Sequence, residues 1–125
     1  RNLPALLRAF RIQEKAAGVG FDFPAPENAW EKVDEELGEF RALLSSDAST
    51  VEKEKELGDL FFALINYSRL SGLNPENALG RTNDKFIRRF QGVEKGLEEE
   101  GISLVDANLE QMDVHWDRIK KEERT

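Results

Sequence analysis

The 125-residue sequence contains no cysteine, which excludes disulfide bonds, thiolate nucleophiles and cysteine-based zinc or iron–sulfur sites. This absence fits a reducing compartment, and we expect a cytoplasmic protein. The longest apolar run, residues 60–65, is far shorter than the roughly 20 residues that span a bilayer. The first residues alternate basic and apolar side chains and lack the apolar core and cleavage site of a signal peptide. The sequence therefore predicts no membrane segment.

Basic residues are also fewer than acidic residues, and this limits the kinds of molecule that the protein can bind. The net charge of −7 argues against binding to the phosphate backbone of a nucleic acid polymer. A small anionic ligand stays compatible if metal ions or a local basic cluster offset the carboxylates. The sequence has no GxxxxGK[ST] loop, so a P-loop NTPase is not supported.

Few prolines and long charged–apolar alternations favour an all-α protein. Ser49 and Glu52 have the spacing of a capping box, and Asn74 before Pro75 is a helix start signal. The short connections favour an antiparallel helical bundle of about five helices in one domain of residues 1–125. The predicted helices span residues 3–17, 27–44, 50–70, 75–99 and 109–122.

Two similar acidic motifs occur in the second and third predicted helices, ELGEF at residues 36–40 and ELGDL at residues 56–60. In each motif two carboxylates stand three residues apart, so each pair lies on one helix face, one turn apart. Glu35 extends the acidic sector of the first motif. Oxygen ligands of this kind suit Mg²⁺ or Mn²⁺ better than zinc. The paired carboxylates are Glu36 and Glu39 in the first motif and Glu56 and Asp59 in the second.

Structural explanations for these carboxylates stay open at this point. The acidic residues of the second helix are compatible with a solvated face. Asp59 lies in an apolar run that we expect to be buried on nearly all sides, where a lone carboxylate is costly unless it is paired or metal-bound. An ion pair is therefore the alternative to a metal site. The candidate partners of Asp59 are Arg41, Arg69, Arg81 and Arg89.

Two further features of the helices have structural interpretations. A ferritin-like di-iron site needs Glu-x-x-His motifs, whereas the single histidine, His115, follows Met112 by three residues. We therefore expect His115 to be structural or to lie on the surface. Gly38 and Gly58 each cost about 1 kcal/mol relative to alanine in a helix. Close helix approach or a simple packing role would explain them.

The fourth predicted helix carries a basic cluster within RTNDKFIRRF, residues 81–90. Lys85 and Arg89 share a face, with Arg81 and Arg88 beside them. In an acidic protein the cluster is a candidate phosphate clamp, with ordinary salt bridging as the alternative. Carboxylates and cations together indicate phosphate-ester chemistry on a nucleotide-like substrate, with metal ions and a general base activating water. The candidates for that base are Glu35 and Glu36.

The chain resembles the MazG nucleoside triphosphate pyrophosphohydrolases, of the all-α NTP pyrophosphatase superfamily, over nearly its whole length. The segments that carry the resemblance include NLPALLRAFRIQEKAAGVGFDF, KVDEELGE, KELGDLFFALINYSR, TNDKFIRRFQGVE and VHWDRIK. The EExxE…ExxD pattern of the family is met by residues 35–39 and 56–59. The GVGFDF loop and the intact carboxylate set resemble the C-terminal, catalytic domain of relatives with two such domains. The missing initiator methionine fits excision from a longer protein.

The resemblance implies Mg²⁺-dependent hydrolysis of nucleoside triphosphates to the monophosphate and pyrophosphate, in the clean-up or regulation of nucleotide pools. Mn²⁺ is the alternative metal, and the family implies a homodimer whose helices pack into a joint bundle. The alternatives are a narrower relative, such as a dUTPase-like or phosphoribosyl-ATP pyrophosphohydrolase, and a non-catalytic helical dimerisation module.

The resemblance also implies residue roles. Glu36, Glu39, Glu56 and Asp59 would bind Mg²⁺, with Glu35 at or beside the metal. The nucleotide and phosphate contacts would be Lys32, Lys85, Arg88, Arg89 and Trp116. Trp116 taken alone is more typical of a core residue than of a base-stacking platform. Lys53 and Lys55 lie in a segment where the family has contacts, but its residues vary there.

Overall fold

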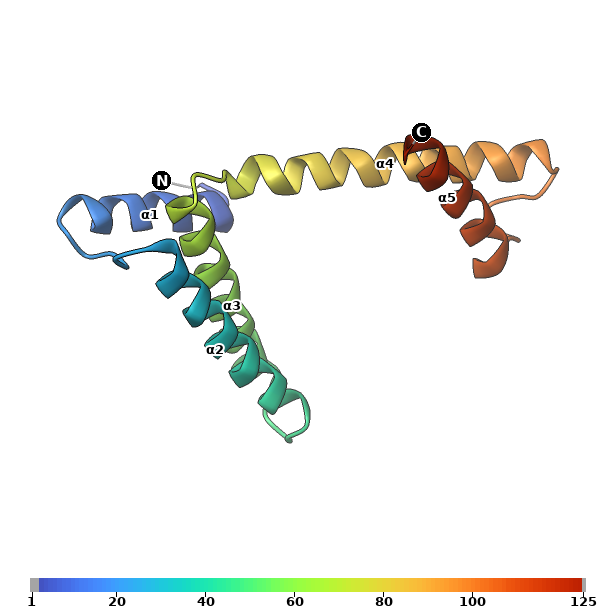
Figure 1. Ribbon diagram of the computed structural model, residues 1–125. Helices are drawn as coiled ribbons and strands as arrows, with labels where there is room; N and C mark the ends of the chain where they lie inside the picture. The colour runs from blue at the N-terminus through green and yellow to red at the C-terminus, as the bar shows by residue number, and fades with distance from the viewer. Residues whose placement is uncertain (1–2, 125) are drawn as a thin grey trace. The chain divides into compact units, whose positions relative to one another are not determined.

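A computed structural model describes residues 3–124, and these residues form five α-helices and no strand (Figure 1). The all-α class and all five helices are confirmed, with boundaries within two residues of those predicted. None of the helices in this part of the chain combines the length and the apolarity needed to cross a bilayer. The helices are α1 (Ala5–Gly18), α2 (Pro26–Leu44), α3 (Thr50–Leu70), α4 (Pro75–Glu99) and α5 (Leu109–Arg124).

Side-chain caps fix the starts of α3 and α4. The Oγ of Ser49 accepts a hydrogen bond from the backbone N–H of Glu52 at 3.2 Å, and the Glu52 carboxylate accepts one from the N–H of Ser49 at 3.0 Å. The Oδ1 of Asn74 accepts from a backbone N–H in the first turn of α4 at 3.0 Å. These bonds satisfy donors that the first turn of a helix leaves without partners. Both predicted caps are therefore confirmed.

The chain forms two compact units, Arg1–Ala78 and Leu79–Thr125. In the first unit α2 and α3 pack side by side as an antiparallel hairpin (Figure 1). α1 lies across the end of this hairpin where α2 begins and α3 ends, and it contacts α3. The buried side chains of this unit are Ala29, Val33, Ala63 and Ile65, with the polar Gln13 and Glu36.

α3 is less buried than the sequence predicted. Phe61, Phe62 and Leu64 are 57%, 41% and 38% exposed, and Asp59 is exposed as well. Within the described part of the first unit only α1 and α2 pack substantially on α3, so part of its apolar surface has no covering helix. The expectation that Asp59 is buried is therefore wrong for the single chain, in which Glu36 is the buried carboxylate among the residues described.

In the second unit α4 packs closely on α5 at two glycines. A Cβ atom added at Gly96 would overlap the imidazole of His115, whose Cε1 lies 2.6 Å from that position. A Cβ at Gly92 would overlap the side chain of Ile119. Val93, Gly96 and Leu97 are buried along this face of α4. The absence of side chains at the two glycines therefore allows the helices to approach.

Close helix approach does not explain Gly38 and Gly58. A Cβ added at either glycine meets no atom within 4 Å in the described chain. The alternative of a simple packing role within the chain fails for the same reason. Both glycines leave open space along the hairpin of α2 and α3.

Candidate metal and nucleotide site

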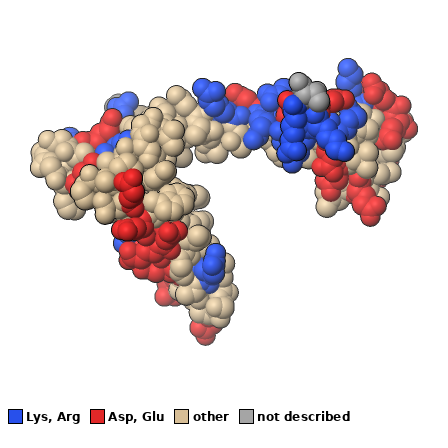
Figure 2. Space-filling model, in the orientation of Figure 1, with Lys and Arg blue, Asp and Glu red and all other residues tan. Residues whose placement is uncertain are grey.

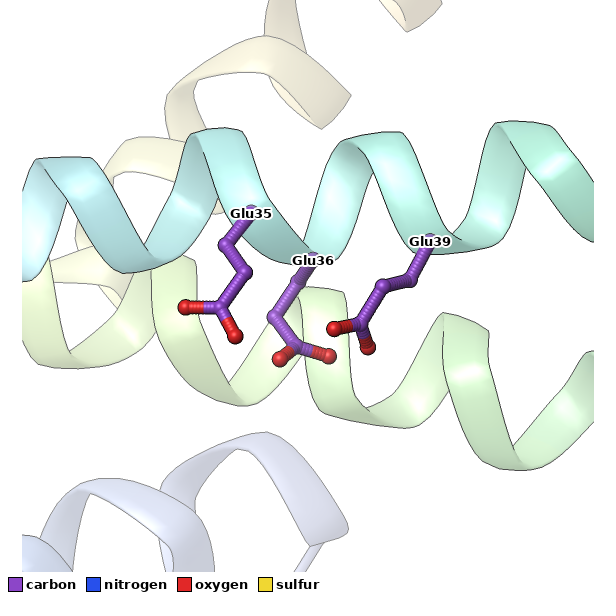
Figure 3. Close-up of side chains that lie close together, drawn as sticks. All are labelled: Glu35, Glu36 and Glu39. Atoms are coloured by element: carbon purple, nitrogen blue, oxygen red, sulfur yellow. The ribbon is translucent and has the colours of Figure 1, made fainter.

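Three glutamates extend from one side of α2, and they are Glu35, Glu36 and Glu39 (Figure 3). One carboxylate oxygen from each lies within 4.8 Å of the others. The arrangement follows from the helical period, because residues one turn apart share a face. Acidic side chains consequently gather over the hairpin of α2 and α3 (Figure 2).

Glu36 also belongs to a second acidic group, with Glu56 and Asp59 of α3. One carboxylate oxygen from each of these three residues lies within 4.8 Å of the others. The two groups meet at Glu36 because α2 and α3 pack against each other along their length. The structure thus places the four carboxylates of the two motifs, together with Glu35, in two groups that share Glu36.

The hydrogen bonding of this acidic site is incomplete. Glu36 is 5% exposed, and its Oε2 lies 3.0 Å from the Nζ of Lys32. The other oxygen, Glu36 Oε1, is buried and has no hydrogen-bond partner within residues 3–124, and Glu56 Oε2 is in the same condition. Buried polar atoms normally have partners, because leaving one unsatisfied is costly. A cation with oxygen ligands would satisfy both atoms, so the residues present fit Mg²⁺ or Mn²⁺.

The electrostatics of the site also favour a bound cation. Burial raises the pKa of Glu56, and the carboxylates of Glu39, Asp59 and Glu36 raise it further. Lys32 acts in the opposite direction, and its own pKa is raised, chiefly by its hydrogen bond to Glu36. Among the described residues Lys32 is the cation that forms ion pairs with this acidic site. One lysine leaves most of the negative charge uncompensated.

The ion-pair alternative for Asp59 is wrong in this structure. No basic side chain within residues 3–124 forms an ion pair with Asp59. Two of the four arginines considered as partners are paired elsewhere, Arg69 with Asp22 and Arg89 with Glu123. Asp59 therefore contributes an exposed, unpaired carboxylate to the rim of the acidic site.

A cavity of about 580 Å³ opens beside the carboxylates and lies wholly within the first unit. Glu36, Asp59 and Lys32 form part of its lining, together with residues of α1, α3 and the loop after α1. The volume is typical of small-molecule sites. Its apolar lining consists of Ile12, Ala16, Phe21, Phe23, Phe62 and Ala63.

An ion pair fixes the loop that forms one wall of this cavity. Arg69 of α3 donates two hydrogen bonds to Asp22, from Nη1 to Oδ2 at 2.9 Å and from Nη2 to Oδ1 at 2.7 Å. This contact lowers the pKa of Asp22. Gly20 has a φ of 92°, which favours glycine, and it lets the chain turn out of α1 into the loop.

The polar residues of the cavity wall were not predicted from the sequence. Gln13, Asp22, Asn66 and Arg69 line the cavity, but no motif singled them out as a binding site. Arg69 was considered only as a candidate ion-pair partner of Asp59, and Asn66 was not considered. The available signal was the GVGFDF loop, whose two phenylalanines flank an acidic residue between helices.

The basic cluster belongs to the second unit, where basic side chains gather over α4 and α5 (Figure 2). Arg89 donates to Glu123 Oε1 from Nη2 at 2.7 Å and from Nε at 3.0 Å, and Arg88 Nε lies 3.6 Å from Glu123 Oε2. The Arg89 guanidinium stands 5.5 Å from the ring centroid of Trp116, which also packs on Phe86. Salt bridging thus accounts for Arg88 and Arg89 in this structure, whereas Lys85 is exposed.

His115 has the structural role expected of it. It is 8% exposed and packs over Gly96. Its Nδ1 accepts a hydrogen bond from Arg118 at 3.3 Å, so Nε2 carries the hydrogen and donates to Glu100 Oε1 at 2.8 Å. These contacts tie α5 to the end of α4.

Comparison with known proteins identifies relatives along nearly the whole chain. The chain is 40% identical over 123 residues to the nucleoside triphosphate pyrophosphohydrolase/pyrophosphatase MazG of Thermotoga maritima. The matched region covers 98% of this chain and 47% of that protein. The chain is 39% identical over 127 residues to the nucleoside triphosphate pyrophosphohydrolase of Escherichia coli K12, with the same coverage. The uncharacterized protein YabN of Bacillus subtilis is 49% identical over 69 residues, which are 55% of this chain and 14% of YabN.

No family model matches the chain. The chain spans about half the length of the Thermotoga maritima and Escherichia coli relatives.

Proposed function

Because the chain is homologous to the MazG nucleoside triphosphate pyrophosphohydrolases over 98% of its length, we propose that it hydrolyses nucleoside triphosphates. In the proposed reaction one water molecule adds to the substrate, and a nucleoside monophosphate and pyrophosphate leave. A role in the clean-up or regulation of nucleotide pools is part of the same proposal.

The observation that carries this proposal is the buried carboxylate of Glu36, which two acidic groups share and whose Oε1 has no partner among the described residues. We assign Glu36, Glu39, Glu56 and Asp59 as the residues that would hold Mg²⁺, and the same oxygens suit Mn²⁺. A bound divalent ion would neutralise charge on the departing pyrophosphate and lower the pKa of a coordinated water.

Glu35 and Glu36 are the candidates for the general base, and their surroundings favour Glu35. The side chain of Glu35 is 55% exposed, whereas that of Glu36 is 7% exposed. The Nζ of Lys32 lies 3.4 Å from Glu35 and 3.0 Å from Glu36, so it can orient both carboxylates. Glu35 therefore has the better access to water, from which it would accept a proton as the oxygen attacks phosphorus.

Lys32, Lys85, Arg88, Arg89 and Trp116 are the proposed contacts of the nucleotide. For Lys32 the support is its position on the cavity wall beside Glu36. For the four residues of the second unit the support is the resemblance, together with the affinity of guanidinium groups for phosphate. Arg88 and Arg89 would have to exchange Glu123 for phosphate oxygens.

A homodimer is part of the proposal. Its support is the apolar surface that α3 leaves exposed at Phe61, Phe62 and Leu64. Exposed apolar patches often mark contacts with other chains. The open space beside Gly38 and Gly58 would also let another helix approach the hairpin.

Two alternatives have different consequences. A dUTPase-like or phosphoribosyl-ATP pyrophosphohydrolase would use the same carboxylates on a narrower range of substrates. A non-catalytic dimerisation module would need the carboxylates only for ion pairs, and the unpartnered oxygens of Glu36 and Glu56 argue against it.

A product-resolved assay tests the proposal. The purified chain is incubated with Mg²⁺ and a panel of ribo- and deoxyribonucleoside triphosphates, and the products are separated by anion-exchange chromatography. We expect monophosphate and pyrophosphate in equal amounts, and no turnover when a chelator removes the metal. Release of diphosphate and orthophosphate, or no turnover with either Mg²⁺ or Mn²⁺, would contradict the proposal. Turnover of dUTP or phosphoribosyl-ATP alone would support the narrower alternative.

A further inference from the structure

Gln13 of α1 is 4% exposed, and only one end of its side-chain amide is satisfied. Its Nε2 donates a hydrogen bond to the backbone carbonyl of Phe62 at 3.0 Å. Because a carbonyl oxygen only accepts, this bond fixes which end of the amide faces α3. The opposite end, Oε1, is buried and has no partner among the described residues. The amide therefore holds a rigid acceptor that lacks a donor.

Gln13 lines the same cavity as Glu36 and Asp59. The cavity also has aromatic walls, from Phe21 and Phe23 of the loop and from Phe62 of α3. Flat, apolar surfaces of this kind suit the face of an aromatic ring. The cavity thus combines a place for a planar ring with the carboxylates of the acidic site.

A second unsatisfied group on the cavity wall is a donor. Arg69 uses Nη1 and Nη2 for Asp22, and Nη2 also donates to Asn66 Oδ1 at 3.0 Å. Its Nε–H is buried and has no partner within residues 3–124. Two residues of the cavity wall therefore hold buried polar atoms without partners within residues 3–124, an acceptor on Gln13 and a donor on Arg69. A base edge with an amino group beside a ring nitrogen presents the complementary pair.

We propose that this cavity binds the nucleobase of the substrate and that Gln13 selects bases that carry an exocyclic amino group, such as adenine or cytosine. The inference rests on the proposed function, which makes a nucleotide the ligand. The amino group donates to Gln13 Oε1, and Arg69 Nε donates to the neighbouring ring nitrogen. A base without the amino group leaves the buried oxygen unsatisfied, and sites built around such a bond discriminate strongly against the analogue that lacks it.

Nucleosides test this inference apart from the reaction, because they carry no phosphate. Dissociation constants are measured by titration calorimetry or ligand-observed NMR for two matched pairs, adenosine with purine riboside and cytidine with its 4-deamino analogue. We expect the amino-bearing member to bind at least about tenfold more tightly in one pair or both. Equal affinities within both pairs, or no binding of any of the four nucleosides, would overturn the inference.

Gln13→Met supplies the second test, because it keeps the length of the side chain and removes both polar ends. The affinity ratio within the discriminated pair should fall to about one. Gln91→Met is the matched control at an exposed glutamine of α4, and it should keep the wild-type ratio. An unchanged ratio in folded Gln13→Met would overturn the role of Gln13.

Loss of the bond to Phe62 can also unfold Gln13→Met, so the wild-type protein provides an independent readout. In ¹⁵N-labelled protein, the side-chain amide resonance of Gln13 should shift with the amino-bearing nucleoside and stay in place with its deamino partner. A resonance that responds equally to both would overturn the inference.

The two proposals can fail separately. Amino discrimination without release of monophosphate and pyrophosphate would support the base site and contradict the proposed reaction. Release of monophosphate and pyrophosphate without amino discrimination would support the proposed reaction and contradict the base site.

Discussion

In the first unit Glu36 and Glu56 each keep a buried carboxylate oxygen without a partner, whereas in the second unit Arg89 and Glu123 satisfy each other at 2.7 Å. A self-satisfied ion pair has a structural explanation within the chain. A buried unpartnered oxygen is costly, and its retention in a folded protein points to a ligand. The structure itself therefore supports a ligand site at the carboxylates, while a ligand role for the cations rests on the resemblance to relatives.

Glu36→Gln is the substitution with the largest expected effect, and it tests the ligand site at the carboxylates. The variant keeps the size of the side chain and removes the charge that both acidic groups share. We expect kcat/KM for a nucleoside triphosphate to fall at least about 100-fold, because even residues that only support metal ligands cost 10- to 100-fold. The measurement is pyrophosphate release at saturating Mg²⁺.

Asp34→Asn is the matched control, because Asp34 is an exposed acid on α2 outside both acidic groups. It should leave turnover unchanged, and both variants should keep the helical circular dichroism of the wild type. Full activity in Glu36→Gln would contradict the assignment of the metal site.

Packing gives a second contrast between the units, and glycine-to-alanine variants test it. Gly96→Ala places a methyl group against the ring of His115, so we expect a loss of about 1–3 kcal/mol of unfolding free energy. Gly58→Ala meets open space in the chain and should stabilise α3 by up to about 1 kcal/mol. Denaturant unfolding measures both.

Gly58→Ala also bears on the proposed homodimer. If a second chain packs at Gly58, the added methyl group should weaken dimerisation, which sedimentation velocity would detect. Similar effects of the two alanine variants on a monomeric protein would contradict the contrast in packing.

Local signals account for the success of the sequence analysis with the helices and with the acidic motifs. The caps at Ser49 and Asn74 involve residues three positions apart, and the carboxylates share a face because the helical period is fixed. Such features depend on neighbours in the sequence. They are therefore visible before the tertiary structure is known.

Contacts between residues far apart in the sequence could not be predicted from such local patterns. Gln13 and Phe62 are separated by 49 positions, and Asp22 and Arg69 by 47, so no spacing rule connects them or reveals the cavity that they line. Asp59 was expected to be buried because its neighbours are apolar, but apolar neighbours do not reveal which faces a helix leaves uncovered. Burial and hydrogen-bond satisfaction depend on packing partners that local patterns cannot identify.

A subtler test of the comparison is the pH dependence of stability in chelator-treated protein. Glu56 has a pKa raised above its ordinary value of 4.5, chiefly by burial, so the folded state holds the proton more tightly than the unfolded chain does. Its destabilising effect is absent below 4.5 and develops as the pH rises through the raised pKa. Glu123 has a pKa lowered by Arg89, so its stabilising effect is present above 4.5 and is lost as the pH falls through the lowered pKa.

Glu56→Gln should therefore reduce the change of melting temperature with pH above pH 4.5. Glu123→Gln should reduce the change of melting temperature with pH below pH 4.5. Thermal circular dichroism across this range measures both profiles. If both variants changed the melting temperature in the same pH range, the opposite pKa shifts of Glu56 and Glu123 would be disproved.

The smallest expected effect concerns substrate binding by the second unit. Glu123 occupies Arg88 and Arg89, so it would compete with substrate phosphates for the same guanidinium groups. Glu123→Gln removes the competing charge, and we expect KM for a nucleoside triphosphate to fall a few-fold with kcat little changed. Asp117→Asn, an exposed acid of α5, makes the same change in net charge and should leave KM nearly constant. A KM that does not respond to Glu123→Gln, or responds equally to Asp117→Asn, would leave the arginines with the structural role that their ion pairs already explain.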